Sequence, residues 1–259
     1  MRRDASRALR YHNLSLFLRL TSVIVLWVLL LLTASASGQT TLTEEEMFQS
    51  HVVQFEDKEH VLGDSVPTIR AMIESTLRQV IKVFPLTAVK IIVVPDPKRA
   101  IPNYGIGGYT PNANTVFIYL DLAFPEFPRV VAERLPATLA HELHHCMRWR
   151  GPGYGRTLFE ALITEGLAEH FALELLGAHR PWSDAFPRDD TAKFLALAQP
   201  EFDSTTYNHP RWFFGGDPTL PRWTGYTLGF RLVEAYKAQH SGATAVTLVH
   251  MPARVFRPQ

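Results

Sequence analysis

The chain has 259 residues, enough for one or two domains with a sizeable buried core, and its hydrophobic content of 46% is that of a globular protein. Its 26 basic and 25 acidic side chains nearly cancel, so the net charge of +1 gives no reason to expect a nucleic-acid partner. The single cysteine, Cys146, excludes an intrachain disulfide.

The first 36 residues are organised like an export signal. Arginines stand near the start, the stretch from Thr21 to Thr33 is almost purely apolar, and Ala34-Ser35-Ala36 matches a signal-peptidase site. We therefore expect cleavage after Ala36. The alternative is an uncleaved membrane anchor formed by residues 14–36, which are long enough to cross a bilayer although Arg19 interrupts them. Either reading places the rest of the chain outside the cytoplasm, in a periplasmic or extracellular space.

The next segment, residues 37–63, is polar and predicts a linker, with a short helix around Met47 to Phe55. A longer helix follows from Asp64 to Phe84, because apolar residues recur there at helical spacing. Pro85 ends it.

Two short strands are expected next, at Val89 to Val94 and at Asn114 to Asp121. Between them, residues 96–111 read as a loop whose glycines make turns, although they could also let the backbone approach a ligand. The strands would form a small sheet whose edge could pair with an extended peptide.

Two helices form the centre of the chain. The first is expected from Ala137 to about Trp149, directly after Pro136, and the second from Thr157 to Leu176, with Gly177 at its end. The short glycine-rich turn between them lets the second helix fold back antiparallel onto the first.

Beyond these helices, residues 181–221 look irregular, with a short helix at Asp190 to Ala198 and an aromatic loop at Trp212 to Asp217. The last clear helix is expected from Arg222 to His240. Gly225 and Gly229 stand four residues apart on it, so another backbone could pack closely there.

The pentapeptide from His141 to His145 carries the chemistry, because it reads H-E-x-x-H. Two histidines four residues apart project from one face of a helix, where they can hold Zn²⁺ and leave Glu142 beside it as a general base. A catalytic zinc site needs a third protein ligand and one open position.

Glu165 and Glu169 are the acidic residues placed to complete the site, since they share one face of the second helix. One of them can reach the metal while the other accepts the free ring N–H of a ligating histidine. A donor for the oxyanion is also required. Tyr226 is the first candidate, and His209 is the second.

Other residues near the motif have simpler interpretations. Cys146 points about 100° away from His145 on the helix, which favours a small buried apolar role. His144 is expected to flank the site or to support a ligating residue from behind, while His170 and His179 are expected to pack or to face solvent. Glu160 is expected to support a ligating residue, to face solvent or to cap the helix.

The pattern H-E-x-x-H followed by E-x-x-x-E resembles the gluzincin metallopeptidases, which include thermolysin. That resemblance implies that Glu165 is the third ligand and that Glu169 orients His141, although this chain has Glu where the family pattern has Asp. The run T-L-x-E-A-L-x-x-E-G-L-A-E and the later G-Y-x-x-G-F are similar to a domain family described as predicted zinc-dependent proteases, over Asp64 to His240.

Together these observations predict an α+β fold: a mainly helical, zincin-like domain with a small sheet packed before the motif helix. The expected organisation is a signal or anchor at 1–36, a linker at 37–63 and one catalytic domain at 64–259. The predicted function is an exported zinc metallopeptidase acting on a peptide or protein, with a membrane tether if residues 14–36 are retained. The alternatives are an inactive zinc-stabilised binding domain and a zinc hydrolase of a non-peptide amide or ester.

Overall fold

The computed structural model describes residues 42–258, so the predicted signal or anchor at 1–36 lies outside the described residues. The predicted α+β class is confirmed. None of the helices within residues 42–258 has both the length and the apolar character that crossing a membrane requires. The elements in chain order are α2 (Glu44–Gln49), β1 (Val52–Phe55), α3 (Ser65–Ile81), β2 (Lys90–Pro95), β3 (Ile106–Asn112), β4 (Thr115–Leu120), α4 (Phe127–Trp149), α5 (Leu158–Leu176), α6 (Thr191–Ala198), α7 (His209–Phe213), α8 (Thr224–Gln239) and α9 (Ala245–Leu248).

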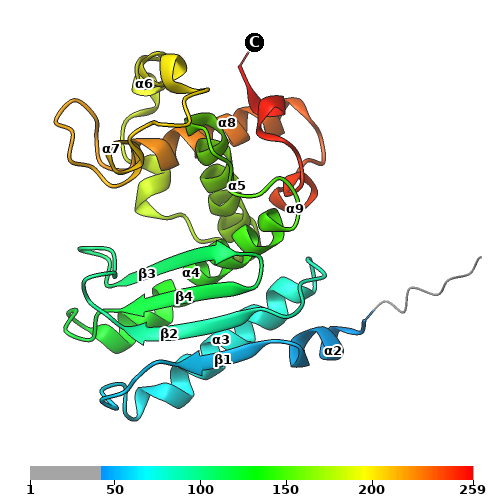
Figure 1. Cartoon of the computed structure of the whole chain (residues 1–259), viewed down its shortest axis with the longest axis vertical. Coiled ribbons are helices and arrows are strands. Elements are labelled where there is room, and N and C mark those ends of the chain that lie inside the picture. Colours follow the sequence, from blue (N-terminus) through cyan, green and yellow to red (C-terminus); the bar gives the residue numbers. More distant parts are fainter. Residues whose placement is uncertain (1–41, 259) are drawn as a thin grey trace, which may run out of the picture. The chain divides into compact units, whose positions relative to one another are not determined.

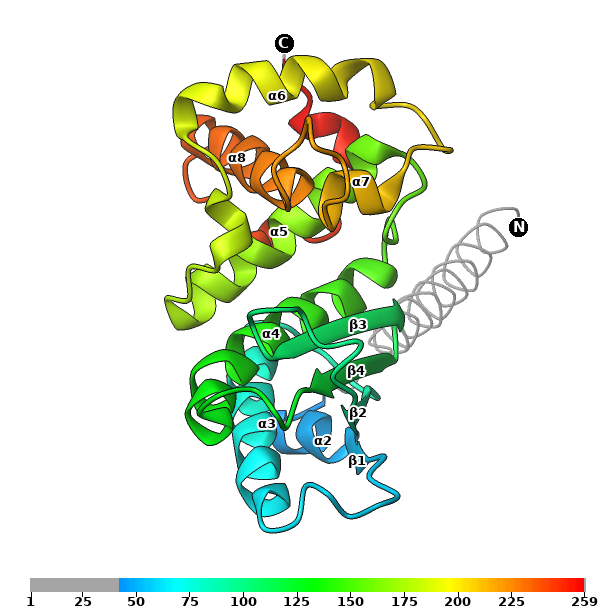
Figure 2. The same cartoon turned by 90° about the vertical axis from the view of Figure 1, so that its left-hand side faces the viewer.

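The four strands form one sheet in the order β1-β2-β4-β3. The pairs β1–β2 and β2–β4 are parallel, while β3 runs antiparallel to β4 at the edge. Figures 1 and 2 show α3 and α4 beside the sheet and β3 as the strand nearest to α5, α7 and α8. The edge strand β3 therefore lies where the sheet meets the helices.

Two strands were not expected from the sequence. Residues 96–111 were predicted as a loop, but they contain most of β3, because pairing with β4 brings a glycine-containing segment of low strand propensity into the sheet. The helix predicted at Met47 to Phe55 is also wrong: α2 ends at Gln49, and Val52–Phe55 forms β1 beside β2. Both strands depend on partners distant in sequence, which local patterns do not reveal.

The motif helix α4 begins at Phe127, ten residues before the predicted start at Ala137, and contains Pro136. An internal proline removes one helical hydrogen bond and costs about 3 kcal/mol. Val131 and Leu135 in the added turns are buried in the core, and this packing offsets the cost.

The second motif helix α5 has the predicted ends. The Thr157 side chain accepts a hydrogen bond from the Glu160 amide, and the Glu160 carboxylate accepts one from the Thr157 amide, which forms a capping box. Gly177 closes the helix with a φ of 67°, which suits glycine.

Helices α5 and α8 cross in backbone contact. A Cβ added at Gly229 would lie 1.9 Å from the Leu162 carbonyl oxygen, and one at Gly166 would lie 2.2 Å from the Gly229 carbonyl oxygen. The close approach predicted at Gly229 is therefore confirmed. Gly225 instead faces the Phe213 ring, 2.7 Å from an added Cβ, and Phe213 belongs to α7 in a region that was expected to be mostly loop.

Two hydrophobic cores support the structure. One packs the sheet against α3 and α4, and the other fills the space between α5, α6, α7 and α8. Tyr226 packs against both cores. Helix α5 contributes residues to both cores, whereas α4 contributes to the first.

Candidate active site

The two motif histidines project from the buried half of α4. His141 and His145 are 5% and 4% exposed, and their rings pack edge to face with centroids 4.5 Å apart. Their Nε2 atoms are 2.9 Å apart. The i, i+4 spacing therefore brings two ring nitrogens to one point, as predicted.

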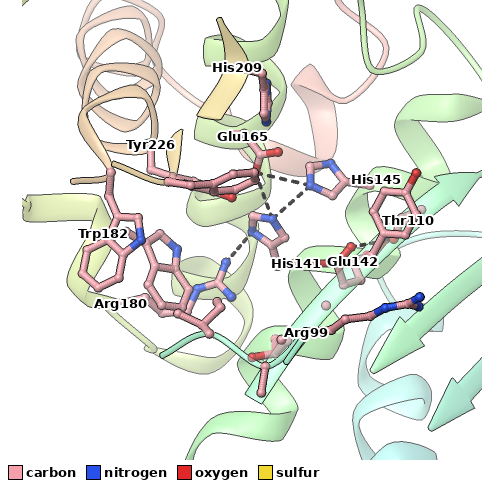
Figure 3. Close-up of a pocket in the computed structure, with 18 of the residues that line it drawn as sticks. Arg99, Thr110, His141, Glu142, His145, Glu165, Arg180, Trp182, His209 and Tyr226 are labelled. Carbon is pink, nitrogen blue, oxygen red and sulfur yellow. Dashed lines mark hydrogen bonds and ion pairs between the residues drawn. The ribbon is translucent and has the colours of Figure 1, made fainter. Parts of the chain in front are cut away.

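Glu165 of α5 meets the two histidines at that point. Its Oε2 lies 3.1 Å from Nε2 of His141 and 3.4 Å from Nε2 of His145. Figure 3 shows the three side chains converging. One ligand atom from each residue lies within 4.8 Å of the others, a spacing that can hold a metal ion.

The charges and the unused lone pairs of this cluster fit a divalent cation. Oε2 of Glu165 is buried and accepts no hydrogen bond from residues 42–258. Although burial raises the pKa of Glu165, the neighbouring His145 and His141 outweigh it and keep the pKa well below its usual range. Burial lowers the pKa of His141, and Arg180 lowers it further, but Glu169 and Glu165 raise it to about 9. A positive charge is thus favoured where the ligand atoms meet, and the two nitrogens with one carboxylate match zinc.

Glu169, one turn after Glu165 on α5, lies behind His141. Its Oε1 is 2.9 Å from Nδ1 of His141, so a proton on Nδ1 leaves Nε2 free for a metal. The arrangement matches the role that the gluzincin resemblance implies for Glu169.

Glu169 is in turn surrounded by donors that the sequence did not indicate. Arg180 pairs with both carboxylate oxygens and also contacts Nδ1 of His141. Trp182 Nε1 donates to Oε1 at 2.7 Å, and Ser183 Oγ donates to Oε2 at 3.0 Å. Although burial raises the pKa of Glu169, Arg180 and His141 lower it to about 2. The carboxylate behind His141 is therefore ionised and fixed.

Glu142 points from α4 toward the edge strand β3. The Thr110 hydroxyl donates to its Oε2 at 2.7 Å. A Cβ at Gly108 would lie 2.4 Å from its Oε1, so glycine leaves the room that the carboxylate occupies. Gly108 was predicted to make a turn. It lies in a strand and lets the backbone approach Glu142 instead.

Tyr154, in the turn between α4 and α5, also holds the cluster. Its hydroxyl donates to Oε1 of Glu165 at 2.6 Å. Burial and the Glu165 charge raise the pKa of Tyr154 well above its usual value, so the phenol keeps its proton. The hydrogen bond leaves Oε2 of Glu165 for the two histidines.

The candidate oxyanion donors lie near the cluster. Figure 3 shows Tyr226 of α8 across His141 from Glu142, with His209 of α7 above Glu165. Burial and Glu165 raise the pKa of Tyr226 well above its usual value, so it stays a hydroxyl donor. The Tyr207 hydroxyl lies 3.0 Å from Nδ1 of His209. Both candidate donors line the cavity.

The other candidate residues near the motif are buried in packing contacts, exposed to solvent or used as a helix cap. Cys146 is buried, as expected, and His144 is fully buried against Phe84 and Phe171. The ring of His170 stacks on Phe230, whereas His179 is exposed. Glu160 caps α5.

The cluster opens into a cavity of about 770 Å³. Its walls come from the segment before β3, from β3, α4, the turn before α5 and α5 itself, and from η1 (Pro181–Asp184), α7 and the start of α8. Every residue proposed for catalysis or metal binding lines it: His141, Glu142, His145, Glu165 and Tyr226. A pocket of this volume accommodates several residues of a peptide or a drug-sized ligand.

Sequence reasoning missed Thr110, Tyr154 and Arg180. Each contacts a glutamate of the motif from a loop or strand outside the two motif helices. Thr110 is 32 residues from Glu142, whereas Tyr154 and Arg180 are each 11 residues from the glutamate that they contact. The segment containing Tyr154 offered one weak signal, since a turn joining two facing helices must lie beside the residues they present.

Comparison with known proteins gives one family. A sequence profile described as "Predicted Zn-dependent protease (DUF2268)" matches residues 69–257. The chain is similar to the "Uncharacterized protein YjfC" of Bacillus subtilis (strain 168), with 24% identity over 164 residues, covering 58% of this chain and 53% of that protein. The chain thus spans about half the length of this curated relative. No solved structure matches.

Proposed function

The chain belongs to the family of predicted zinc-dependent proteases, and we propose that it is a metallopeptidase of the gluzincin arrangement, with zinc held by His141, His145 and Glu165. The convergence of the two Nε2 atoms on Oε2 of Glu165 carries this proposal. Three protein ligands leave a fourth position open, as catalytic zinc requires.

Bound zinc would supply a Lewis acid that polarises a scissile carbonyl and lowers the pKa of water. Glu142 is the general base. Thr110 holds its Oε2, and the absence of a side chain at Gly108 leaves its Oε1 space beside the cavity. A carboxylate held by one oxygen keeps the other available to accept a proton from the attacking water and to deliver it to the leaving amine.

Tyr226 is the donor for the oxyanion in this proposal. It lines the cavity on the side of His141 away from Glu142, and its raised pKa keeps the hydroxyl protonated at neutral pH. A hydroxyl aimed at the developing negative charge stabilises the transition state more than the ground state.

The edge strand β3 is suited to hold the substrate backbone. It pairs with β4 on one side, and Gly107, Gly108 and Thr110 line the cavity on its course past Glu142. An extended peptide could therefore add to this edge and carry its scissile bond toward the cluster.

Peptide cleavage by the zinc-loaded wild type and by Glu142→Gln tests this function. The substitution keeps size and removes the base, so we expect a loss of about a thousandfold or more in kcat with zinc still bound, since general-base catalysis contributes about 10² to 10⁴. A broad peptide library that neither protein cleaves, with zinc bound to both, would exclude peptidase activity.

We also propose that the protein is exported. The support is the arginine-rich start, the apolar stretch and Ala34-Ser35-Ala36. Mass analysis of the mature protein should find Ser37 as its first residue. A mature chain that retains residues 14–36 in the membrane fraction would favour the anchor, and one that is found with Met1 in the cytoplasm would exclude export.

A further inference from the structure

The charged side chains of the cavity are divided by sign. Glu142 and Glu165 are its acidic lining residues within the described chain, and both belong to the catalytic cluster. The other charged lining residues are cations: Lys98, Arg99, Arg180 and Arg222. Arg180 is neutralised by Glu169. Away from the cluster, the cavity therefore presents positive charge.

Arg222 is a cation of the cavity wall that packs against its neighbours. Its guanidinium carbon lies 4.6 Å from the centre of the Trp223 ring, and its Cγ would be 3.3 Å from a Cβ at Gly215. The side chain is half-buried, and its Nε is buried without a hydrogen-bond partner among residues 42–258. Arg222 thus has hydrogen-bonding capacity that the described chain does not use.

The backbone beside it has an uncommon conformation. Trp223 has a φ of 68°, which is rare for a bulky residue and is sustained only where the surroundings enforce it. Its ring packs edge-on against Trp182, with centroids 5.6 Å apart. This packing fixes the platform on which the Arg222 guanidinium lies.

Lys98 and Arg99 add positive charge before β3. Both are exposed. Arg99 donates to the Tyr119 hydroxyl at 3.1 Å and lies 3.5 Å from a carboxylate oxygen of Asp96. Exposed charges of this kind contribute long-range attraction more than a specific contact.

We propose that Arg222 is a specificity-determining residue that binds a carboxylate of the peptide substrate, either an acidic side chain or the C-terminal carboxylate. This inference rests on the proposed function for its substrate class. A planar guanidinium stacked on an aromatic ring suits a carboxylate, to which it can donate two parallel hydrogen bonds. Lys98 and Arg99 raise the local concentration of acidic peptides.

The test uses sets of peptides that differ at one position, Glu, Gln or Lys, each with a free or an amidated C-terminus. The ratio of kcat/KM values is measured for wild type, Arg222→Gln and Arg254→Gln. Arg254→Gln is the control, because it changes the net charge by the same amount as Arg222→Gln, while Arg254 is exposed and does not line the cavity. For wild type and Arg254→Gln, kcat/KM should be about tenfold higher for the peptide that carries the carboxylate than for its neutral counterpart. This is the size expected for a partly exposed charged hydrogen bond. Arg222→Gln should lose the preference.

The source of the carboxylate follows from the peptide ends. A preference for Glu that survives amidation assigns an acidic side chain, whereas a preference for the free terminus alone assigns the C-terminal carboxylate. Arg222→Lys keeps the charge and loses the planar donor pair, so it should retain only part of the preference. If Arg222→Gln does not fold, the reduced preference of Arg222→Lys still tests whether Arg222 binds the carboxylate. Equal use of Glu, Gln and free or amidated ends by wild type, or a preference unchanged in Arg222→Gln, would overturn the proposal.

Binding separates this inference from the proposed function. The same peptides are titrated by calorimetry into Glu142→Gln, with and without Arg222→Gln. An Arg222-dependent carboxylate preference in binding, with no cleavage by wild type, would leave this site standing and exclude the peptidase. Cleavage that requires Glu142 but is equally fast for acidic and neutral peptides would support the peptidase and exclude the Arg222 site.

Discussion

The buried pair of Arg180 and Glu169 gives a quantitative prediction. Arg180 is 4% exposed and Glu169 is 1% exposed, and Arg180→Met would remove the cation while keeping much of its volume. Removing one partner of a buried pair costs about 3–5 kcal/mol, because the remaining charge is left uncompensated. Trp182 and Ser183 still donate to Glu169, so the low end, about 3 kcal/mol, is expected.

Urea unfolding of the metal-free protein measures this loss without the contribution of a bound ion. With an m-value of about 2–3 kcal/mol/M for a chain of this size, the midpoint should fall by roughly 1 M or more. Arg254→Met is the matched control, since an exposed arginine should change stability by less than about 0.5 kcal/mol. Adding Glu169→Gln to Arg180→Met should recover part of the loss. Equal midpoints for Arg180→Met and Arg254→Met would refute the reasoning.

Three further predictions concern packing, metal binding and reactivity. Gly229→Ala should destabilise the protein by more than about 2 kcal/mol in chemical unfolding, because the added Cβ would lie 1.9 Å from the Leu162 carbonyl oxygen. An unchanged unfolding midpoint would contradict the α5–α8 contact. Tyr154→Phe should weaken zinc binding about tenfold in competition titrations, since it frees Oε1 of Glu165, and wild-type affinity would show that the bond does not support the site. Burial and the Glu142 charge raise the pKa of the Cys146 thiol to about 12. A thiol reagent at pH 8 should therefore label Cys146 only as fast as the protein unfolds. Rapid labelling of the folded protein would contradict this prediction.

The sequence predicted α5 and the C-terminal half of α4 well, because their signals are local. Thr157 and Gly177 mark the ends of α5 through capping chemistry that involves only neighbouring residues. The spacing from His141 to His145, and from Glu165 to Glu169, fixes which side chains share a face. The short turn between the helices makes them antiparallel neighbours, so the histidine face of α4 and the glutamate face of α5 meet.

The elements that frame the site depend on distant contacts and were harder to predict. β3 is a strand because it pairs with β4, and Gly108 gives no side-chain alternation to reveal it. Pro136 suggested a helix boundary, yet α4 continues through it because the preceding turns are buried. Arg180 reaches Glu169 from a segment that has no regular pattern.

Zinc content tests the central claim most directly. Wild type and Glu165→Gln are purified identically, equilibrated with zinc, and analysed by elemental mass spectrometry, with Glu160→Gln as a control that changes a capping carboxylate on the same helix. Wild type and Glu160→Gln should each hold one zinc ion per chain, and Glu165→Gln should lose it, because a neutral amide replaces the carboxylate on which both histidines converge. A full equivalent of zinc in Glu165→Gln, or none in wild type, would contradict the account.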